Sequence, residues 1–211
     1  MDYLLLALLW ILWCAVHSGM ISRTVTEFVA RHFGSHYRFY RIFFNILAVA
    51  TIIPIVIFAR SLEGPVLLRW DGLWIAIQLP LLTASLLLFL AGVGHYDMLQ
   101  LLGFRQIVTG TSHKTLSEAG KLNTSGILSV TRHPWYLGTI LLCWTASQSL
   151  DTATLVTNVI LTSYLIVGAL LEERKLIAEF GDEYREYQLR VPMLLPLPWK
   201  RRLKNTEAVV G

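Results

Sequence analysis

The stretch YLLLALLWILWCAVHSGMI, residues 3–21, decides the fold class of this chain. It contains no Asp, Glu, Lys or Arg, and it is close in length to the roughly 20 apolar residues that a helix needs to cross about 30 Å of hydrocarbon. It also lacks the small-residue cleavage pattern that marks a removable signal peptide. We therefore expect this stretch to form a membrane helix of the mature protein.

Four more apolar stretches follow, at about residues 42–59, 73–93, 135–150 and 154–171. Pro54 and Pro80 lie inside the first two of these, where a bundled membrane helix can accommodate a kink. Only a short polar turn around Ser149 and Asp151 separates the last two stretches, which predicts an antiparallel hairpin. The composition agrees, because 55% hydrophobic and 15% charged residues leave too few charges to cover a soluble globule. The predicted fold class is all-α, an integral membrane helical bundle of about five transmembrane helices.

The carboxyl-terminal quarter of the chain has a different character. In EERKLIAEFGDEYREYQLR, residues 172–190, charged residues accompany an apolar stripe at helical spacing, formed by Leu176, Ile177, Phe180, Tyr184 and Tyr187. This pattern predicts a cytoplasmic amphipathic helix, which either lies on the membrane surface or forms a lid over a site. The single membrane domain, residues 1–211, then comprises three transmembrane helices (1–93), a cytoplasmic loop (94–134), the helical hairpin (135–171) and a cytoplasmic helix and tail (172–211).

The positive charges predict how the chain is oriented. Of its 18 Lys and Arg residues, all but Arg60 and Arg69 fall between the first and second apolar stretches, between the third and fourth, or after the fifth. Because such charges accumulate on the cytoplasmic side, we expect the amino terminus outside and the carboxyl terminus in the cytoplasm. The net charge of +4 then reflects topology and attraction to anionic membrane lipid, and not nucleic-acid binding. Since no targeting segment is evident, a multi-pass protein of a bacterial inner membrane is the expectation.

Two polar clusters are the candidates for chemistry. Residues 132–136, RHPWY, precede the hairpin, and Glu172, Glu173 and Arg174 follow it. Because both ends of an antiparallel hairpin meet on one side of the membrane, the clusters should lie together, and polar groups at the bilayer edge are functional candidates. The alternative is that these residues are ordinary helix-end and snorkelling charges. Cys14 and Cys143 lie inside predicted helices without metal-ligand spacing, so we expect no metal site.

The order of motifs resembles a known superfamily. GILSVTRHPWYLG (126–138), one hairpin, and LLEERKLIAEFGDEYREYQLRVPMLLP (170–196) are similar to the isoprenylcysteine carboxyl methyltransferase and phospholipid methyltransferase superfamily of membrane enzymes. In the amino-terminal half, His17-Ser18, Tyr40-Arg41 with Asn45, and HYDMLQLLGFRQ (95–106) resemble its methanethiol S-methyltransferase and NnrU-like branch. This resemblance implies a methyltransferase that binds S-adenosyl-L-methionine at the cytoplasmic end of the bundle, with the final helix and tail closing over it.

The resemblance also implies which residues bind the cofactor. We expect His133 and Glu173 to contribute most, followed by Arg132, Tyr136 and Glu172, while Pro134 begins the helix after them. Gly92 and Gly94 resemble a short glycine motif near the cofactor, although glycines in membrane helices more often permit close packing. Arg190 or Arg105 can stabilise an anionic acceptor, and the alternative for Arg190 is a charge at the end of an amphipathic helix. For His17 and Ser18 the alternative to substrate contact is an interhelical hydrogen bond.

The methyl acceptor stays open at this stage. A small thiol is the leading hypothesis, and an isoprenylcysteine carboxylate or a phospholipid amine is the alternative within the same class. A non-catalytic, NnrU-like accessory protein of a redox pathway is the alternative from another class. A transporter or channel is least favoured, because no inverted repeat is evident and charged residues are not found deep inside several helices.

Overall fold

The computed structural model describes residues 1–109 and 122–195. The predicted loop and tail lie partly outside this range, in residues 110–121 and 196–211. The long helices are α1 (Asp2–Ile21), α3 (Tyr40–Ser61), α4 (Ile75–Val93), α7 (Pro134–Thr145) and α8 (Thr152–Phe180). Shorter helices are α2 (Arg23–Phe33), α5 (Met98–Leu102), α6 (Phe104–Thr109) and α9 (Asp182–Arg190), with 3-10 turns η1 (Gly34–Phe39), η2 (Gly72–Trp74) and η3 (Gly126–Ser129).

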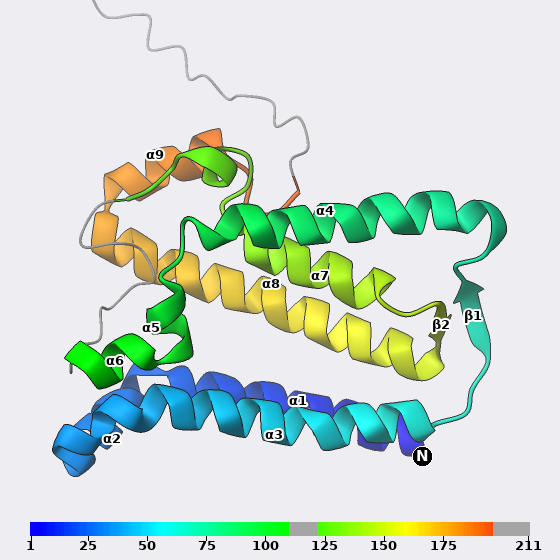
Figure 1. The fold of residues 1–211 in the computed structure, drawn as a ribbon, viewed down its shortest axis with the longest axis horizontal. Helices are drawn as coiled ribbons and strands as arrows, with labels where there is room; N and C mark the ends of the chain where they lie inside the picture. Colours follow the sequence, from blue (N-terminus) through cyan, green and yellow to red (C-terminus); the bar gives the residue numbers. More distant parts are fainter. Residues whose placement is uncertain (110–121, 196–211) are drawn as a thin grey trace, which may run out of the picture.

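The long helices form a layered bundle with α8 in the middle (Figure 1). On one side α1 and α3 pack against each other and against α8, and on the other side α4 packs against α7, which in turn packs against α8. A buried apolar cluster lies where α1, α3 and α8 meet. It is formed by Leu6 and Trp10 of α1, Ile55 of α3 and Ala153 of α8. The all-α helical bundle predicted from the apolar stretches is thereby confirmed.

Four helical segments of the described chain are long and apolar enough to cross a membrane: Asp2–Ile21, Arg23–Ser61, Gly72–Val93 and Thr152–Phe180. The helix expected at about residues 135–150, the fourth of the five, is present as α7, but it has 12 residues and rises only about 18 Å. It ends at Thr145 instead of near residue 150. The chain then becomes extended, because β2 (Ser149–Asp151) pairs antiparallel with β1 (Val66–Arg69), a pairing that the apolar pattern did not predict.

Local capping explains where the helices begin. Pro134 occupies the first turn of α7, as expected from its sequence position. The Asp151 carboxylate accepts a hydrogen bond of 2.7 Å from the backbone N–H of Thr154 and so caps α8. Gly181, with a φ of +59°, permits the sharp turn that separates α8 from α9.

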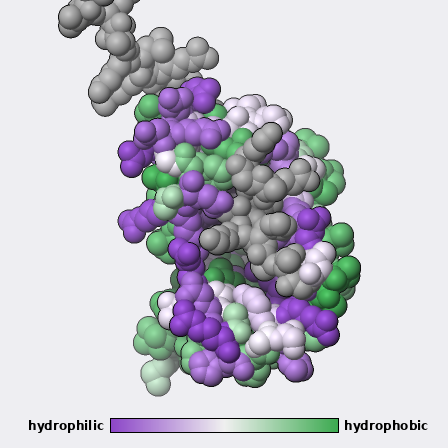
Figure 2. Space-filling model, turned by 90° about the vertical axis from the view of Figure 1, so that its left-hand side faces the viewer, coloured by the Kyte–Doolittle hydropathy of each residue, from purple (hydrophilic) through white to green (hydrophobic). Residues whose placement is uncertain are grey.

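The surface separates into apolar sides and one polar end. Large apolar side chains are exposed along the long helices, among them Leu4, Ile46, Ile57, Leu87 and Val167, as expected where lipid is the solvent. Hydrophilic residues gather on the end of the bundle that carries α2, α6 and α9, with apolar side chains at its margins (Figure 2). The described parts of the three segments predicted to be cytoplasmic, which include α2, α6 and α9, share this end, while residue 1 lies at the opposite end (Figure 1). The chain is a membrane protein, and which side of the membrane this end faces stays a prediction.

The cap of α8 should contribute measurably to stability. Replacing Asp151→Ala removes the acceptor for the Thr154 N–H, which typically costs about 1 kcal/mol and lowers the Tm by roughly 2–4 °C for a chain of this size. Asp71→Ala is the matched control, since Asp71 precedes η2 without a side-chain cap. Thermal unfolding in detergent measures both variants, and equal shifts would contradict the capping role.

Candidate functional site

A buried ion pair lies where the two ends of the α7–α8 hairpin meet. The Nε and Nη2 atoms of Arg132 both lie 2.6 Å from Oε1 of Glu173, and each of the two side chains is only 8% exposed. The Nη1 atom of the same guanidinium donates to the carbonyl oxygens of Gln188 (3.2 Å) and Val191. Arg132 therefore joins the start of α7, the end of α8 and the segment after α9.

Three protein groups occupy the carboxylate of Glu173. Besides Arg132 at Oε1, the Nε2 atom of His133 lies 3.3 Å from this oxygen, and the amide of Gln188 donates to Oε2 at 2.7 Å. The His133 ring is almost fully buried. Since charge-assisted hydrogen bonds of this kind are the strong ones, Glu173 is mainly engaged in holding protein groups together.

Glu172 is the more open of the two glutamates. Its side chain is 35% exposed, and Oε2 accepts a hydrogen bond of 2.8 Å from the hydroxyl of Tyr136. The other ring nitrogen of His133, Nδ1, lies 3.9 Å from the same oxygen, so the imidazole sits between both carboxylates. Glu172 is thus positioned by the protein and still accessible to a ligand.

The segment after α9 is bound directly to the segment that carries the site. The backbone N–H groups of Arg132 and His133 donate to the carbonyls of Pro192 (3.0 Å) and Met193 (3.2 Å). The Tyr187 hydroxyl donates to the carbonyl of Leu128, and burial raises the pKa of Tyr187 to about 12, so this donor stays protonated. The amphipathic stripe therefore packs inward over the site, which favours the lid interpretation over a helix that only rests on the membrane surface.

An aromatic wall flanks the polar cluster on the side of α4. The rings of Tyr96 and Trp135 lie 4.4 Å apart, and the indole N–H of Trp135 donates to the Phe89 carbonyl at 3.1 Å. Burial, with the nearby Glu172 carboxylate as the next cause, raises the pKa of Tyr96 well above its usual range. Tyr96 therefore stays a neutral hydroxyl next to the cluster.

The two glycines of the predicted glycine motif have different surroundings. Gly92 is buried under Trp135, and a Cβ added there would overlap the indole ring. Gly94 is exposed, with no atom within 4 Å of the position of such a Cβ. Gly92 thus permits close packing of α4 on α7, which is the packing alternative, whereas nothing in its surroundings gives Gly94 a structural task.

The structure brings together five of the predicted site residues, Arg132, His133, Tyr136, Glu172 and Glu173, and places Pro134 beside them. Arg105 lies on α6, where its Nε is 2.8 Å from Oδ2 of Asp97. Arg190 is exposed, and its Nε donates to the Glu186 carbonyl. The role of these two arginines in binding an anionic acceptor stays a prediction.

Sequence reasoning missed two members of the site. Gln188 follows Tyr187 directly but is not part of the apolar stripe, so no periodicity marked it. Tyr96 belongs to the HYDMLQLLGFRQ motif, and that resemblance was the available signal. Among residues 1–109 and 122–195, no group of three or more His, Cys, Asp or Glu side chains is arranged to hold a metal ion.

Together these features define a helical membrane protein with a buried polar cluster at one end of its bundle. A family model described as "Protein of unknown function (DUF1295)" matches residues 3–191, and the chain belongs to this family.

Curated relatives carry more informative names. The chain is 39% identical over 111 residues to methanethiol S-methyltransferase 1 of Bradyrhizobium diazoefficiens, covering 52% of this chain and 36% of that protein. It is 33% identical over 109 residues to methanethiol S-methyltransferase of Crocosphaera subtropica, covering 52% and 41%. It is 32% identical over 91 residues to protein-S-isoprenylcysteine O-methyltransferase of Schizosaccharomyces pombe, covering 41% and 39%.

The matches thus span about two fifths of the length of these relatives. They confirm the superfamily resemblance seen in the motifs. No solved structure matches the chain.

The buried ion pair predicts a large effect of one neutral substitution. Glu173→Gln leaves the buried Arg132 guanidinium without its counterion, and breaking such a pair typically costs about 3–5 kcal/mol. We expect a markedly lower Tm in detergent. Glu179→Gln, an exposed position on the same helix, is the control and should unfold like the wild type; a similar Tm for all three proteins would contradict the interpretation.

The packing role of Gly92 has its own test. Gly92→Ala forces Trp135 to move, and overpacking of this kind costs roughly 1–3 kcal/mol. Gly94→Ala has open space around the new methyl group and should leave stability unchanged. Thermal unfolding and near-UV circular dichroism of the tryptophans compare the pair, and an unperturbed Gly92→Ala protein would contradict the close approach of α4 and α7.

Proposed function

We propose that this protein is an S-adenosylmethionine-dependent membrane methyltransferase and that the cluster around Glu172 and His133 is its cofactor site. The observation that carries the proposal is the assembly of Arg132, His133, Tyr136, Glu172 and Glu173 into one hydrogen-bonded cluster from both ends of the hairpin. The names of the curated relatives support the reaction class. S-adenosylmethionine, when bound, supplies an electrophilic methyl group on a sulfonium.

The charge and hydrogen-bonding groups of the cluster fit this cofactor. Arg132 neutralises one of the two carboxylates, so these three residues together carry one net negative charge. S-adenosylmethionine at neutral pH has a sulfonium, an ammonium and one carboxylate, which gives it one net positive charge. The opposite signs favour binding, most strongly at a site shielded from water. The Glu172 carboxylate has one oxygen that does not bond to Tyr136, and this oxygen can accept from the ammonium or the ribose hydroxyls.

Each further residue has a task in this proposal. Arg132 and Gln188 hold Glu173 and the end of α9 in place, and the segment at Pro192 and Met193 closes over the site. This closure excludes water and fixes the geometry, which is how a displacement without strong acid or base chemistry is accelerated. Tyr96 and Trp135 offer an aromatic surface on which the adenine can stack.

For the acceptor we propose a small thiol, as the names of two of the relatives suggest. An isoprenylcysteine carboxylate or a lipid amine would use the same donor site. Methylation assays with all three acceptor classes in parallel distinguish these alternatives from the thiol. We also propose that the polar end faces the cytoplasm, where the donor is made, with the amino terminus on the opposite side of a bacterial inner membrane.

Cofactor binding should depend on Glu172. We expect detergent-purified wild type to bind S-adenosylmethionine in calorimetry, and Glu172→Gln to bind at least about tenfold more weakly, which corresponds to about 1.4 kcal/mol. Its fold should be intact, because Glu172 is not part of the buried ion pair. Glu179→Gln is the matched control and should bind like the wild type. Folded wild type without measurable binding would overturn the proposed function, and wild-type affinity in Glu172→Gln would overturn the assignment of the site.

A further inference from the structure

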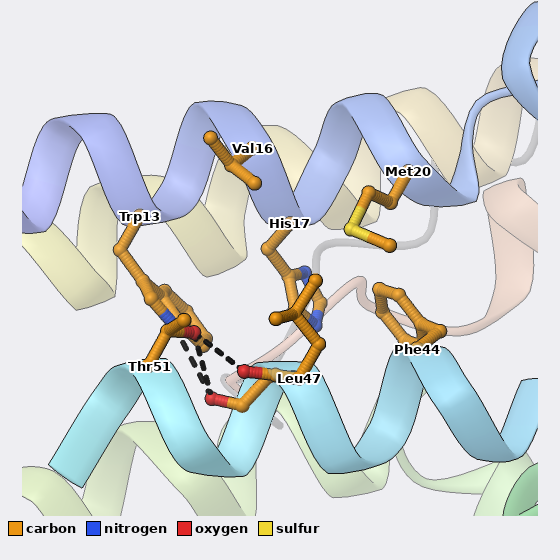
Figure 3. A pocket seen from close by; sticks show the side chains of 8 residues that line it. Trp13, Val16, His17, Met20, Phe44, Leu47 and Thr51 are labelled. Carbon is orange, nitrogen blue, oxygen red and sulfur yellow. Dashed lines mark hydrogen bonds between the residues drawn. The ribbon is translucent and has the colours of Figure 1, made fainter.

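A small groove lies between α1 and α3 (Figure 3), and its lining includes none of the residues of the polar cluster. It contains about 210 Å³ of empty space, counting the part open to the outside. Apolar side chains form nearly all of its lining, notably Trp13, Met20, Phe44 and Leu47. Two lining side chains are polar. The Thr51 hydroxyl donates to the Leu47 carbonyl of its own helix, and the His17 imidazole projects from α1 toward α3 in the middle of the groove (Figure 3).

The orientation of the His17 ring is fixed by three contacts. Its Nδ1 atom lies 2.8 Å from the Tyr164 hydroxyl of α8, which also accepts a hydrogen bond of 3.1 Å from Ser18. The ring stacks on Trp13 with centroids 4.8 Å apart and lies 4.9 Å from the ring of Phe44. Within the described part of the chain, no group is hydrogen-bonded to Nε2. The interhelical hydrogen bond predicted for His17 and Ser18 is therefore present, and it uses only one of the two ring nitrogens.

A positive charge lies close to the groove. The guanidinium carbon of Arg41 lies 5.4 Å from the centre of the Phe44 ring, and its Nε donates to the Leu101 carbonyl at 3.0 Å. Arg41 has no carboxylate partner among the described residues. An anion that forms in the groove therefore gains a favourable electrostatic interaction in surroundings of low dielectric constant.

Helix α8 connects the groove with the polar cluster. Tyr164, Gly168 and Glu172 are spaced four residues apart and so lie on one face of this helix. Tyr136, which bonds to Glu172, also packs against Gly168, where a Cβ would lie 3.4 Å from its ring. The step from Tyr164 to Glu172 is two turns, or about 12 Å along the axis. Tyr164, which contacts His17, and Glu172 of the proposed cofactor site thus lie on one side of α8, two turns apart.

We propose that this groove binds the methyl acceptor, a small alkyl thiol, and that His17, which carries its own proton on Nδ1 and donates it to the Tyr164 hydroxyl, takes the thiol proton at Nε2. The inference rests on the proposed function. The S–H proton moves to Nε2, and the resulting thiolate attacks the methyl carbon of the sulfonium donor. One C–S bond forms while the other breaks, and S-adenosylhomocysteine leaves with the electron pair. The imidazolium then returns its proton to the solvent.

The chemistry of the groove favours a small thiol, because its lining is mostly apolar and aromatic. Sulfur makes favourable contacts with aromatic rings, and Trp13 and Phe44 provide these next to the imidazole. A nearby cation favours the thiolate over the thiol. The titratable groups around His17 in the described residues are Cys14 on α1, Arg41 on α3 and Tyr164 on α8.

The first test is binding of ethanethiol without any cofactor, measured by saturation-transfer NMR on detergent-purified protein. Ala48→Phe places a ring in the groove and should abolish the signal, whereas Val49→Phe, on the exposed face of the same helix, should bind like the wild type. Thermal unfolding of both variants verifies that they fold. Unchanged ethanethiol binding by folded Ala48→Phe would overturn the proposal.

The second test uses His17→Gln, whose amide can still bond to Tyr164 but cannot take up a proton. S-adenosylmethionine affinity should be unchanged, while kcat/KM for methylation of ethanethiol near pH 7 should fall at least tenfold. In the variant this value should rise about tenfold per pH unit as the free thiol ionises, whereas the wild type should level off above the pKa of His17. Parallel profiles, or equal rates, would overturn the role of His17.

The outcomes separate this inference from the proposed function. If folded wild type shows no binding of S-adenosylmethionine, the methyltransferase assignment itself fails. Alternatively, the wild type binds the cofactor and methylates a carboxylate or an amine, but does not bind ethanethiol. This result would support the cofactor site and overturn only the proposed thiol-binding groove.

Discussion

The buried pair of Arg132 and Glu173 is the interaction on which the rest of the site depends. Removing two charges from water is expensive, and their attraction compensates only if the remaining donors and acceptors are also bonded. In this protein the remaining donors and acceptors of the pair are bonded. Arg132 also donates to two backbone carbonyls after α8, and Glu173 also accepts from the Gln188 amide. The partners come from the start of α7, the end of α8 and α9. The ion pair is satisfied only when all three segments are in place, so one electrostatic requirement defines the arrangement of the whole polar end.

This requirement also explains why two adjacent glutamates have different roles. Successive residues of a helix point about 100° apart, so only one of the pair can face Arg132. Glu173 faces it and is buried, while Glu172 turns toward Tyr136 and the outside. His133 lies close to both carboxylates, with Nδ1 3.9 Å from Glu172 and Nε2 3.3 Å from Glu173. Glu173 is therefore held by protein groups, while Glu172 keeps the exposure that the proposed cofactor site requires.

Much of this arrangement followed from the sequence, and the limits have physical reasons. Hydrophobic length was sufficient to predict the bundle, and the hairpin was sufficient to bring RHP and the paired glutamates together. The environment of each glutamate was less accessible, because helical phase relative to Arg132 depends on how α7 and α8 pack. The sequence therefore did not show that Glu173 faces Arg132 while Glu172 stays more exposed. The β1–β2 pairing, which ends the hairpin helix early, is a long-range contact of seven residues that leaves no periodic signal. Gln188 was missed for the same reason, since its task comes from the fold of α9 over the site.

The length of α8 connects the two ends of the proposed chemistry. Its 29 residues rise about 43 Å, more than the roughly 30 Å of a hydrocarbon core. If the helix enters the core near Thr152, Glu172 lies about 30 Å further along, at the water boundary, and Tyr164 lies about 18 Å along, within the apolar region. A charged donor and an apolar acceptor prefer these two depths for opposite reasons of solvation. One helix would therefore carry both the carboxylate of the proposed cofactor site at the water boundary and, two turns deeper, the tyrosine that contacts His17, where we propose that a small apolar thiol enters from lipid.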